Sequence, residues 1–468
     1  MTRIVVVGAG ISGLATAYRL RQALPAAHIT VLEQRDRPGG TIWTEERDGF
    51  RVEVGANGFL DTKLSTLALC HELGLGGRLV PAGDSAGRNR YLFWEGKLQA
   101  LPGGWRAFLG SGLLSWRGKL RLLSEPFRRR RRCGADESVA AFARRRAGRE
   151  AADVLADALV TGIHAGDPAL LSVRAAFPRL CAYEEQYGSV FRGMLAAALR
   201  RRAEAAARGQ VSATGKMWSF REGLRLLIET LQGRLQGQLC LGAAVTRLEK
   251  GVAEGHRPCW TVYGEGQERW TADAVVLTCP AHRQAAVLHD LDRGLADEIA
   301  GIVSNKVAVV ALGYRRDDVP GDLQGFGYIA PQRTRRDVLG VQWCSSIFPG
   351  RAPEGAVLLR AMCGGWHRPE LVGWDDLTLV EAVRRDLYAA MGITAAPRLH
   401  HIVRWEQAIP QYHLGHLERV ARIEARAGSH PGLFLSGNAY HGVALNDCTE
   451  QAGLVAERVG RYLGGAAG

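Results

Sequence analysis

Lysine is scarce in this chain. Only six of the 60 basic residues are lysines, so arginine carries nearly all of the excess that gives a formal net charge of +13. So strong a preference indicates a bias in composition as much as a function, and most of the charge is expected on the solvated surface. We therefore expect no nucleic-acid partner, and we favour an anionic membrane surface or an acidic small substrate as the use of this charge.

Paired cysteines are absent as well. The nine cysteines include no Cys-x-x-Cys pair, which argues against a disulfide framework and against zinc, so we expect no metal site. This usage is typical of a reducing, cytosolic compartment. There is no run of about 18 apolar residues, so we expect no membrane-spanning segment. The first predicted strand begins at Ile4, which leaves no room for a signal peptide, and we expect none.

The most informative stretch lies at the N-terminus. Residues 4–7 form a β-branched strand, and residues 8–13 read Gly-Ala-Gly-Ile-Ser-Gly before a predicted helix. In this Gly-x-Gly-x-x-Gly pattern, Gly8 permits the tight turn and Gly10 lets a pyrophosphate approach the backbone. Gly13 lets the helix pack closely on the strand. The N–H groups at the start of the helix then hold the anion, so the pattern predicts a dinucleotide site.

Three further features extend this site. Glu33 ends a predicted strand at residues 28–33, about 20 residues after the glycines, where an acidic residue holds the ribose hydroxyls of a dinucleotide. A second glycine turn at residues 37–41 reads Arg-Pro-Gly-Gly-Thr, and a third at residues 55–58 follows an alternating strand. A plain NAD-binding domain needs no such additional turns, which place bare backbone next to a ligand.

Residues 105–132 have a different character. Tryptophan, leucine and phenylalanine alternate with basic residues, and the segment ends in five consecutive arginines at 128–132. A basic amphipathic segment flanked by tryptophan is typical of a membrane interface. A core helix with a solvated basic tail explains the same pattern, and both interpretations stay open. Residues 136–209 continue as helical sequence, interrupted by a loop at 161–168.

Strands return beyond residue 218. Residues 274–277 predict another buried strand of the nucleotide sheet, and residues 302–405 read as short strands of a second, mixed sheet with one helix near 378–391. A strand near 432–436 and a helix at 447–463 close the chain. We therefore expect an α/β protein of two or three domains, in which the nucleotide domain is assembled from three separated segments.

Six motifs together resemble one known family. They are the glycine pattern at 8–13, Glu33, the turns at 37–41 and 55–60, and the segments Thr161–Asp167 and Gly442–Cys448. With these motifs the chain resembles the protoporphyrinogen oxidases of the flavin-dependent amine-oxidase-like superfamily, from Thr2 to about Leu463. One departure is His164, where the family usually has Tyr.

The resemblance implies three parts. They are a Rossmann-like FAD domain of the p-hydroxybenzoate-hydroxylase type, a mixed-sheet substrate domain, and a helical insertion that docks on the membrane. The implied bounds are residues 1–85, 213–298 and 413–468 for the FAD domain, 86–212 for the insertion and 299–412 for the substrate sheet. The family also implies a cytoplasmic protein held peripherally on the inner face of the cytoplasmic membrane, and it leaves a homodimer open.

The resemblance further implies site residues. Non-covalent FAD would contact Gly8, Ala9, Gly10, Ile11, Ser12, Gly13, Glu33, Gly40, Thr41, Gly55, Ala56, Asn57, Gly58, Val245, Trp405, Val443, Ala444 and Leu445. The substrate would contact Arg90 through a propionate, Gly162, and Leu323 and Leu339 as part of an apolar clamp on its pyrrole rings. No catalytic side chain is implied, because flavin N5 accepts the hydride.

The implied reaction is the oxidation of protoporphyrinogen IX to protoporphyrin IX in haem biosynthesis, by three hydride transfers to flavin with O2 as acceptor and H2O2 as product. Three alternatives stay open. Oxidation of coproporphyrinogen III to coproporphyrin III would favour a more cationic pocket. A flavin amine oxidase would need an aromatic cage and often a cysteine that tethers the flavin, and residues 405–412 contain no cysteine. A basic membrane-binding protein would use FAD only as structure.

Overall fold

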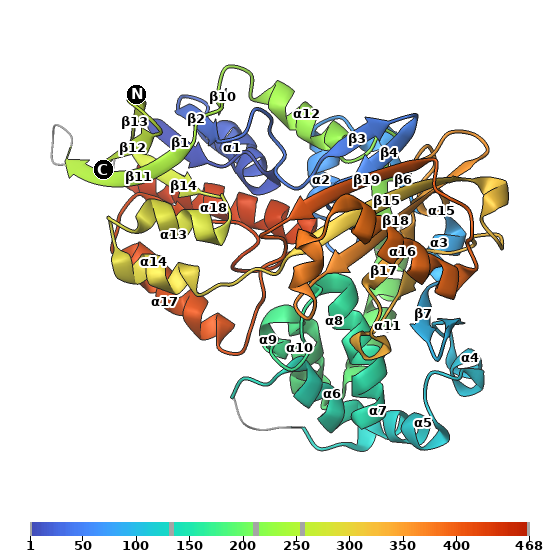
Figure 1. Ribbon diagram of the computed structural model, residues 1–468. Helices are drawn as coiled ribbons and strands as arrows, with labels where there is room; N and C mark the ends of the chain where they lie inside the picture. The colour runs from blue at the N-terminus through green and yellow to red at the C-terminus, as the bar shows by residue number, and fades with distance from the viewer. Residues whose placement is uncertain (1, 131–134, 209–214, 253–257, 466–468) are drawn as a thin grey trace.

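A five-stranded parallel sheet forms the centre of one half of the molecule (Figure 1). The computed structural model describes residues 2–130, 135–208, 215–252 and 258–465. The strand order is β10 (Leu239–Leu241), β2 (His28–Glu33), β1 (Arg3–Val7), β14 (Ala274–Leu277) and β20 (Leu433–Leu435). These strands come from three separated stretches of chain, and the domain bounds given above stay a prediction.

Alternate residues of β1 point to opposite faces of this sheet. Ile4 and Val6 pack in one buried cluster with α1 (Ile11–Ala23), and Val5 and Val7 pack in another. The first cluster also contains residues of α2 (Ser65–Glu72), α12 (Arg225–Arg234) and α18 (Leu445–Gly465). The second contains residues of α13 (Ala281–Leu288), α14 (Arg293–Ala300), α17 (His416–Gly428), and the small sheet of β11 (Val245–Val252), β12 (Pro258–Gly264) and β13 (Arg269–Ala272).

The second half is built on a seven-stranded sheet. Its order is β19 (Leu399–Trp405), β15 (Val307–Arg315), β18 (Ala356–Gly364), β17 (Val338–Trp343), β16 (Gly327–Ile329), β7 (Tyr91–Trp94) and β8 (Lys97–Ala100). All neighbours are antiparallel except β16 and β7, so the expected mixed sheet is confirmed. The hairpin β7–β8 joins this sheet although it lies within residues 86–212. Helix α16 (Asp376–Met391) packs on the sheet.

Two small sheets connect the halves. One is the hairpin of β3 (Thr44–Arg47) and β4 (Phe50–Glu53), and the other contains β5 (Phe59–Leu60), β9 (Met217–Phe220) and β6 (Leu79–Pro81). Short helices in the connections are η1 (Gly76–Arg78), α3 (Asp84–Arg88), η4 (Arg316–Asp318), η5 (Gln332–Thr334), α15 (Cys344–Ile347) and η6 (Pro369–Gly373).

A helical insertion extends from the seven-stranded sheet, at the bottom of Figure 1. It contains α4 (Trp105–Gly110), α5 (Trp116–Leu123), η2 (Glu125–Phe127), α6 (Val139–Ala147), α7 (Arg149–Ala151), η3 (Ala152–Ala156), α8 (Asp157–His164), α9 (Val173–Ala176), α10 (Pro178–Tyr187) and α11 (Val190–Arg208). Within the described ranges, no helix has both the length and the apolar character needed to cross a membrane.

Candidate functional site

A cavity of about 490 Å³ lies where the carboxyl ends of β1 and β2 meet the start of α1. Its size is within the range of about 300–1,000 Å³ that is usual for small-molecule sites. Of the residues predicted to contact a dinucleotide, those that line it are Gly8, Gly10, Ile11, Ser12, Glu33, Gly40, Thr41, Ala56, Val245, Val443 and Leu445. Three separated segments of the chain therefore meet around one cavity.

The three glycines of the first turn differ in what surrounds them. Gly8 has a φ of +104°, which L side chains rarely adopt. A Cβ on Gly13 would lie 1.8 Å from the carbonyl oxygen of Gly8, so only glycine allows α1 to pack this closely on β1. A Cβ on Gly10 would meet no protein atom within 4 Å. The bare backbone at Gly10 therefore faces open space that a ligand can fill.

The start of α1 is suited to an anion. Its N-cap is Gly10, and no side chain caps the helix, so the first N–H groups are available to a ligand. Glu33 is buried at the edge of the same cavity. Its Oε2 accepts from the backbone N–H of Ala9 at 2.8 Å, and its Oε1 accepts from that of Arg35 at 3.1 Å. These bonds fix the carboxylate where ribose hydroxyls are expected.

The turn at residues 55–58 forms part of the wall behind Ala56. A Cβ on Gly55 would lie 2.0 Å from the carbonyl oxygen of Thr41, and one on Gly58 would lie 2.6 Å from that of Trp218. Trp405 donates from Nε1 to the carbonyl oxygen of Val54 at 2.8 Å. The turn is therefore held tightly from several directions.

Asn57 and Ala444 are two further residues that were predicted to contact FAD. Asn57 is buried beside the lining residue Ala56, and neither polar atom of its amide has a partner in the described part of the chain. Its contact with a ligand stays a prediction. The N–H of Ala444 bonds Asp447 at 3.1 Å, which fixes the loop between the lining residues Val443 and Leu445.

Several lining residues were not predicted from the sequence. Arg35 lines the cavity, and its guanidinium carbon lies 5.5 Å from the centre of the Trp405 ring. Its position two residues after Glu33 was the one signal in the sequence that could have predicted it. Cys279, Arg283 and Cys448 also line the cavity. Cys448 is the last residue of the motif at 442–448, whereas no local pattern marks Cys279 or Arg283. Burial raises the pKa of the Cys279 thiol to about 12 and that of Cys448 to about 11, so both stay protonated and weakly nucleophilic at neutral pH.

The predicted substrate residues are only partly brought together. Gly162 lies against β16, where an added Cβ would be 2.6 Å from Cδ1 of Ile329. Leu339 packs in a small cluster with Val307 and Ala165, and Ala165 follows Gly162 by three residues. Leu323 is instead buried in the main core of the seven-stranded sheet. The structure does not join the two leucines in one cluster, and their substrate roles stay predictions.

Arg90 and His164 have contrasting environments. Arg90 is exposed, and its guanidinium lies over the ring of Phe326 at 5.3 Å. His164 is buried beside Phe177 and Tyr412. Burial lowers the pKa of His164 to about 4, so this imidazole is neutral at physiological pH, which fits a packing residue.

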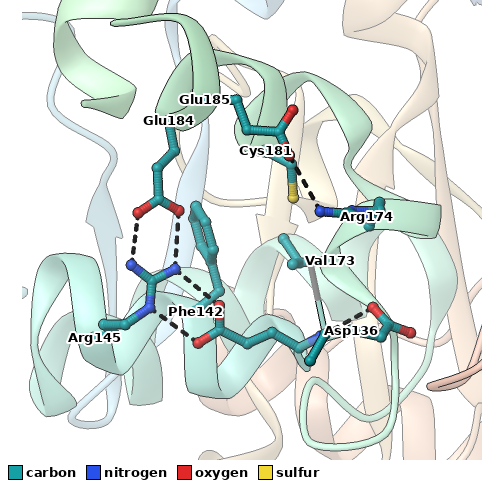
Figure 2. A pocket seen from close by; sticks show the side chains of 10 residues that line it. Asp136, Phe142, Arg145, Val173, Arg174, Cys181, Glu184 and Glu185 are labelled. Carbon is teal, nitrogen blue, oxygen red and sulfur yellow. Dashed lines mark hydrogen bonds and ion pairs between the residues drawn. The ribbon is translucent and has the colours of Figure 1, made fainter. Parts of the chain in front are cut away.

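A second cavity, of about 50 Å³, lies within the helical insertion. Figure 2 shows Arg145 of α6 pointing toward Glu184 of α10. Arg145 donates two hydrogen bonds to Glu184, at 2.6 and 2.9 Å, and two to Glu137, at 2.8 and 3.1 Å. The hydrogen bonds with Glu184 raise the pKa of Arg145 above its usual value. These charges are engaged with one another, so the cavity has the character of a structural ion-pair cluster.

Comparison with known proteins gives a consistent set of relatives. The family model described as flavin containing amine oxidoreductase matches residues 11–460. The chloroplastic protoporphyrinogen oxidase of Nicotiana tabacum is 35% identical, with 98% of this chain and 85% of that protein covered. The coproporphyrinogen III oxidase of Bacillus subtilis is 29% identical, with 96% of each covered. A crystal structure from Exiguobacterium, provisionally named a protoporphyrinogen oxidase, has a TM-score of 0.83 at 28% identity, covering 98% of both chains.

We predict that Gly10→Ala weakens FAD binding without unfolding the protein. The φ of Gly10 is −68° and its Cβ position is open, so the methyl group is tolerated until a ligand approaches. We expect a loss of about tenfold or more, about 1.4 kcal/mol. Flavin fluorescence titration measures the affinity, and circular dichroism measures the Tm of the ligand-free protein.

Gly13→Ala is the matched control, because its Cβ would collide with Gly8 inside the protein. We expect it to lower the Tm of the ligand-free protein, whereas Gly10→Ala does not. An unchanged FAD affinity in Gly10→Ala would contradict the proposed cradle.

Proposed function

This chain belongs to the flavin-containing amine oxidoreductase family, and on that basis we propose that it oxidises a porphyrinogen to the corresponding porphyrin with bound FAD. It is an oxidoreductase. The observation that carries the proposal is the cavity around Gly10, which is built from three distant segments and which the bare backbone of Gly10 faces. Relatives named for porphyrinogen oxidation, which cover nearly the whole chain, support the substrate class.

The residues around the cavity fit FAD. The start of α1 would hold the pyrophosphate, Glu33 would hold the ribose hydroxyls, and the backbone near Val245 would meet the adenine. The turn before Gly58 and the loop Val443–Leu445 would meet the isoalloxazine ring. Bound FAD supplies the electron sink for hydride removal. Non-covalent binding is supported by the protonated state of Cys279 and Cys448, the two thiols that line the cavity.

We favour protoporphyrinogen IX as the substrate, with O2 as the electron acceptor and H2O2 as the product. Coproporphyrinogen III is the second candidate, because a relative named for it is 29% identical over nearly the full length. Its two additional propionates distinguish it chemically. The chain's part in either reaction is to bind the macrocycle, orient one bridge carbon toward the flavin and exclude competing chemistry.

We predict that the purified protein is yellow and that acid precipitation releases one FAD per chain. Supplied anaerobically prepared protoporphyrinogen IX and then air, it should form the fluorescent porphyrin and H2O2 faster than the non-enzymatic rate. Coproporphyrinogen III in parallel tests the second candidate, and a primary amine tests amine oxidation. Flavin that stays with the precipitate, or turnover of the amine alone, would contradict the proposal.

We predict that Arg90→Ala weakens kcat/KM for protoporphyrinogen IX about tenfold. A charge-assisted bond to a propionate contributes about 1.5–3 kcal/mol, and the exposure of Arg90 places the expected loss toward the lower end because water screens the charge. The loss should appear mainly in KM, since a propionate far from the reacting carbon is bound equally in ground and transition states.

Two controls accompany this variant. Arg88→Ala removes a neighbouring exposed arginine and is expected to leave kcat/KM unchanged. The dimethyl ester of the substrate lacks the carboxylates, so Arg90→Ala should not slow its turnover. Equal losses with acid and ester would show that Arg90 is not the propionate partner.

Membrane docking by the helical insertion is also part of the proposal. Trp116, Leu120 and Leu123 are spaced along one side of α5 and are exposed by 65, 65 and 48%, and Phe127 of η2 is exposed by 83%. Beside this ridge, the buried Lys119 has its Nζ 4.8 Å from the centre of the Trp116 ring. It donates to the carbonyl oxygens of Leu109 and Ser111, at the end of α4, at 2.7 and 2.6 Å, which anchors α5. An apolar ridge therefore faces outward beside basic residues.

A buried ion pair fixes the end of this ridge. Arg146 donates from Nε to Glu125 of η2 at 2.7 Å, and both side chains are fully buried. Glu125 also accepts from Ser189 at 2.6 Å and from the N–H groups that start α11 at 3.0 and 3.3 Å. Despite burial, these bonds hold the pKa of Glu125 below its usual value. Phe127 is thus presented from a rigid support.

We predict reversible binding to vesicles that contain phosphatidylserine, and weaker binding as salt rises, because each arginine near such a surface contributes about 1 kcal/mol. Replacing Trp116, Leu120 and Phe127 by serine should abolish co-flotation. Replacing Leu377 and Tyr388, which are exposed apolar residues of α16, should not. Equal flotation of both variants would contradict docking through α5.

A further inference from the structure

Two arginines and one glutamate are buried behind the turn at residues 55–58. Arg360 lies in the middle of β18, Glu53 ends β4, and Arg351 precedes β18. Their exposed fractions are 3, 2 and 0%. Charged side chains are seldom buried this completely without a reason, because removing them from water is costly.

Arg360 connects the seven-stranded sheet to the cavity wall. One terminal nitrogen donates to the carbonyl oxygen of Gly55, and the other donates to Oε1 of Gln342 at 2.9 Å. Gly55 lies between two residues that line the cavity. Ala56 follows it in the chain, and the carbonyl oxygen of Thr41 occupies the place that a Cβ on Gly55 would take. The Nε of Arg360 is buried and has no partner. Since Arg360 is only 3% exposed, its guanidinium is not accessible to a substrate carboxylate.

Glu53 is shared among several donors. Its carboxylate pairs with Arg351 at 3.0 Å and accepts from the hydroxyl of Thr44 at 3.0 Å and the N–H of Leu224 at 2.9 Å. Arg351 also donates to Ser219 at 2.8 Å. Within the described part of the chain, no carboxylate lies within ion-pair distance of Arg360. Burial raises the pKa of Glu53, against the effect of Arg351.

The cluster therefore has a positive net charge. Two guanidinium groups outnumber the single carboxylate, and protonation of Glu53 would increase the difference. Buried charges are screened much less than exposed ones. The positive potential extends to the adjacent cavity wall, where the proposed function places the isoalloxazine ring. Transfer of a hydride to that ring adds one negative charge, since a hydride carries two electrons and one proton.

We propose that Arg360 supplies positive charge to the flavin end of the cavity and so favours reduced over oxidised FAD. The inference rests on the proposed function, because it requires FAD in this cavity. Arg360 holds the turn in place through its hydrogen bond to Gly55, and its positive charge stabilises the negative charge of the reduced flavin. It acts through the field at the cavity wall, in the way that charges near flavin nitrogens tune the ring.

The test is the two-electron midpoint potential of the FAD-loaded full chain, measured by dye equilibration without porphyrinogen. Arg360→Gln should lower the preference for reduced over oxidised FAD about tenfold, which is about 30 mV for a two-electron couple. Arg360→Lys keeps the charge but loses the planar fork, so its potential should stay close to that of the wild type. Arg315→Gln, at the exposed end of β15 in the same sheet, is the control and should change nothing.

A second variant covers the case in which Arg360→Gln does not fold. Gln342→Glu keeps Arg360 and places a carboxylate against it, so it should lower the potential in the same direction. Unchanged potentials in the folded charge variants, or equal decreases in Arg360→Gln and Arg360→Lys, would overturn the inference. Wild-type protein that takes up no FAD would overturn this inference and the proposed function together. A shift as expected without porphyrinogen oxidation would overturn the proposed function alone.

Discussion

The close packing of α1 on β1 is the contact on which the cavity depends. The backbone carbonyl of Gly8 occupies the place where a side chain on Gly13 would lie, so the helix begins directly beyond the strand. Thr278, directly after β14, strengthens the junction, because its hydroxyl shares its one proton between the carbonyl oxygens of Val7 and Gly8, at 2.9 and 3.0 Å. Because of this geometry, the start of α1 lines the cavity. An anionic group bound there can accept hydrogen bonds from the first N–H groups of the helix.

The turn after β4 joins the two halves of the molecule. Trp405 holds the carbonyl of Val54 and Arg360 holds that of Gly55, and both donors belong to the seven-stranded sheet. Thr41 closes against the same turn from the nucleotide side. This part of the cavity wall is therefore held by hydrogen bonds from the seven-stranded sheet and by packing against Thr41, so its position is defined by both halves together.

Local signals in the sequence were sufficient for much of the fold. The strands β1 and β2, the start of α1, the mixed character of the second sheet and helix α16 are confirmed. The tight turn at Gly8, whose φ is +104°, and the close packing of helix on strand at Gly13 are confirmed as well. These features depend on backbone conformation and side-chain periodicity over a few residues, which the sequence displays directly. The resemblance in separated motifs then indicated which ligand and substrate class to expect.

Other features depended on the tertiary structure. The family resemblance implied that Leu323 and Leu339 act together, whereas packing places them in different clusters and brings Ile329 against Gly162. Arg360 is a single charge in an apolar strand, and only the register of β17 and β18 places Gln342 beside it and the turn of β4 over it. The sequence by itself determined the phosphate turn, the acidic residue and the kinds of sheet. Only the fold decided which side chains contact one another. Contacts between segments that lie far apart in the chain follow from packing and strand register, and the spacing of residues does not encode either.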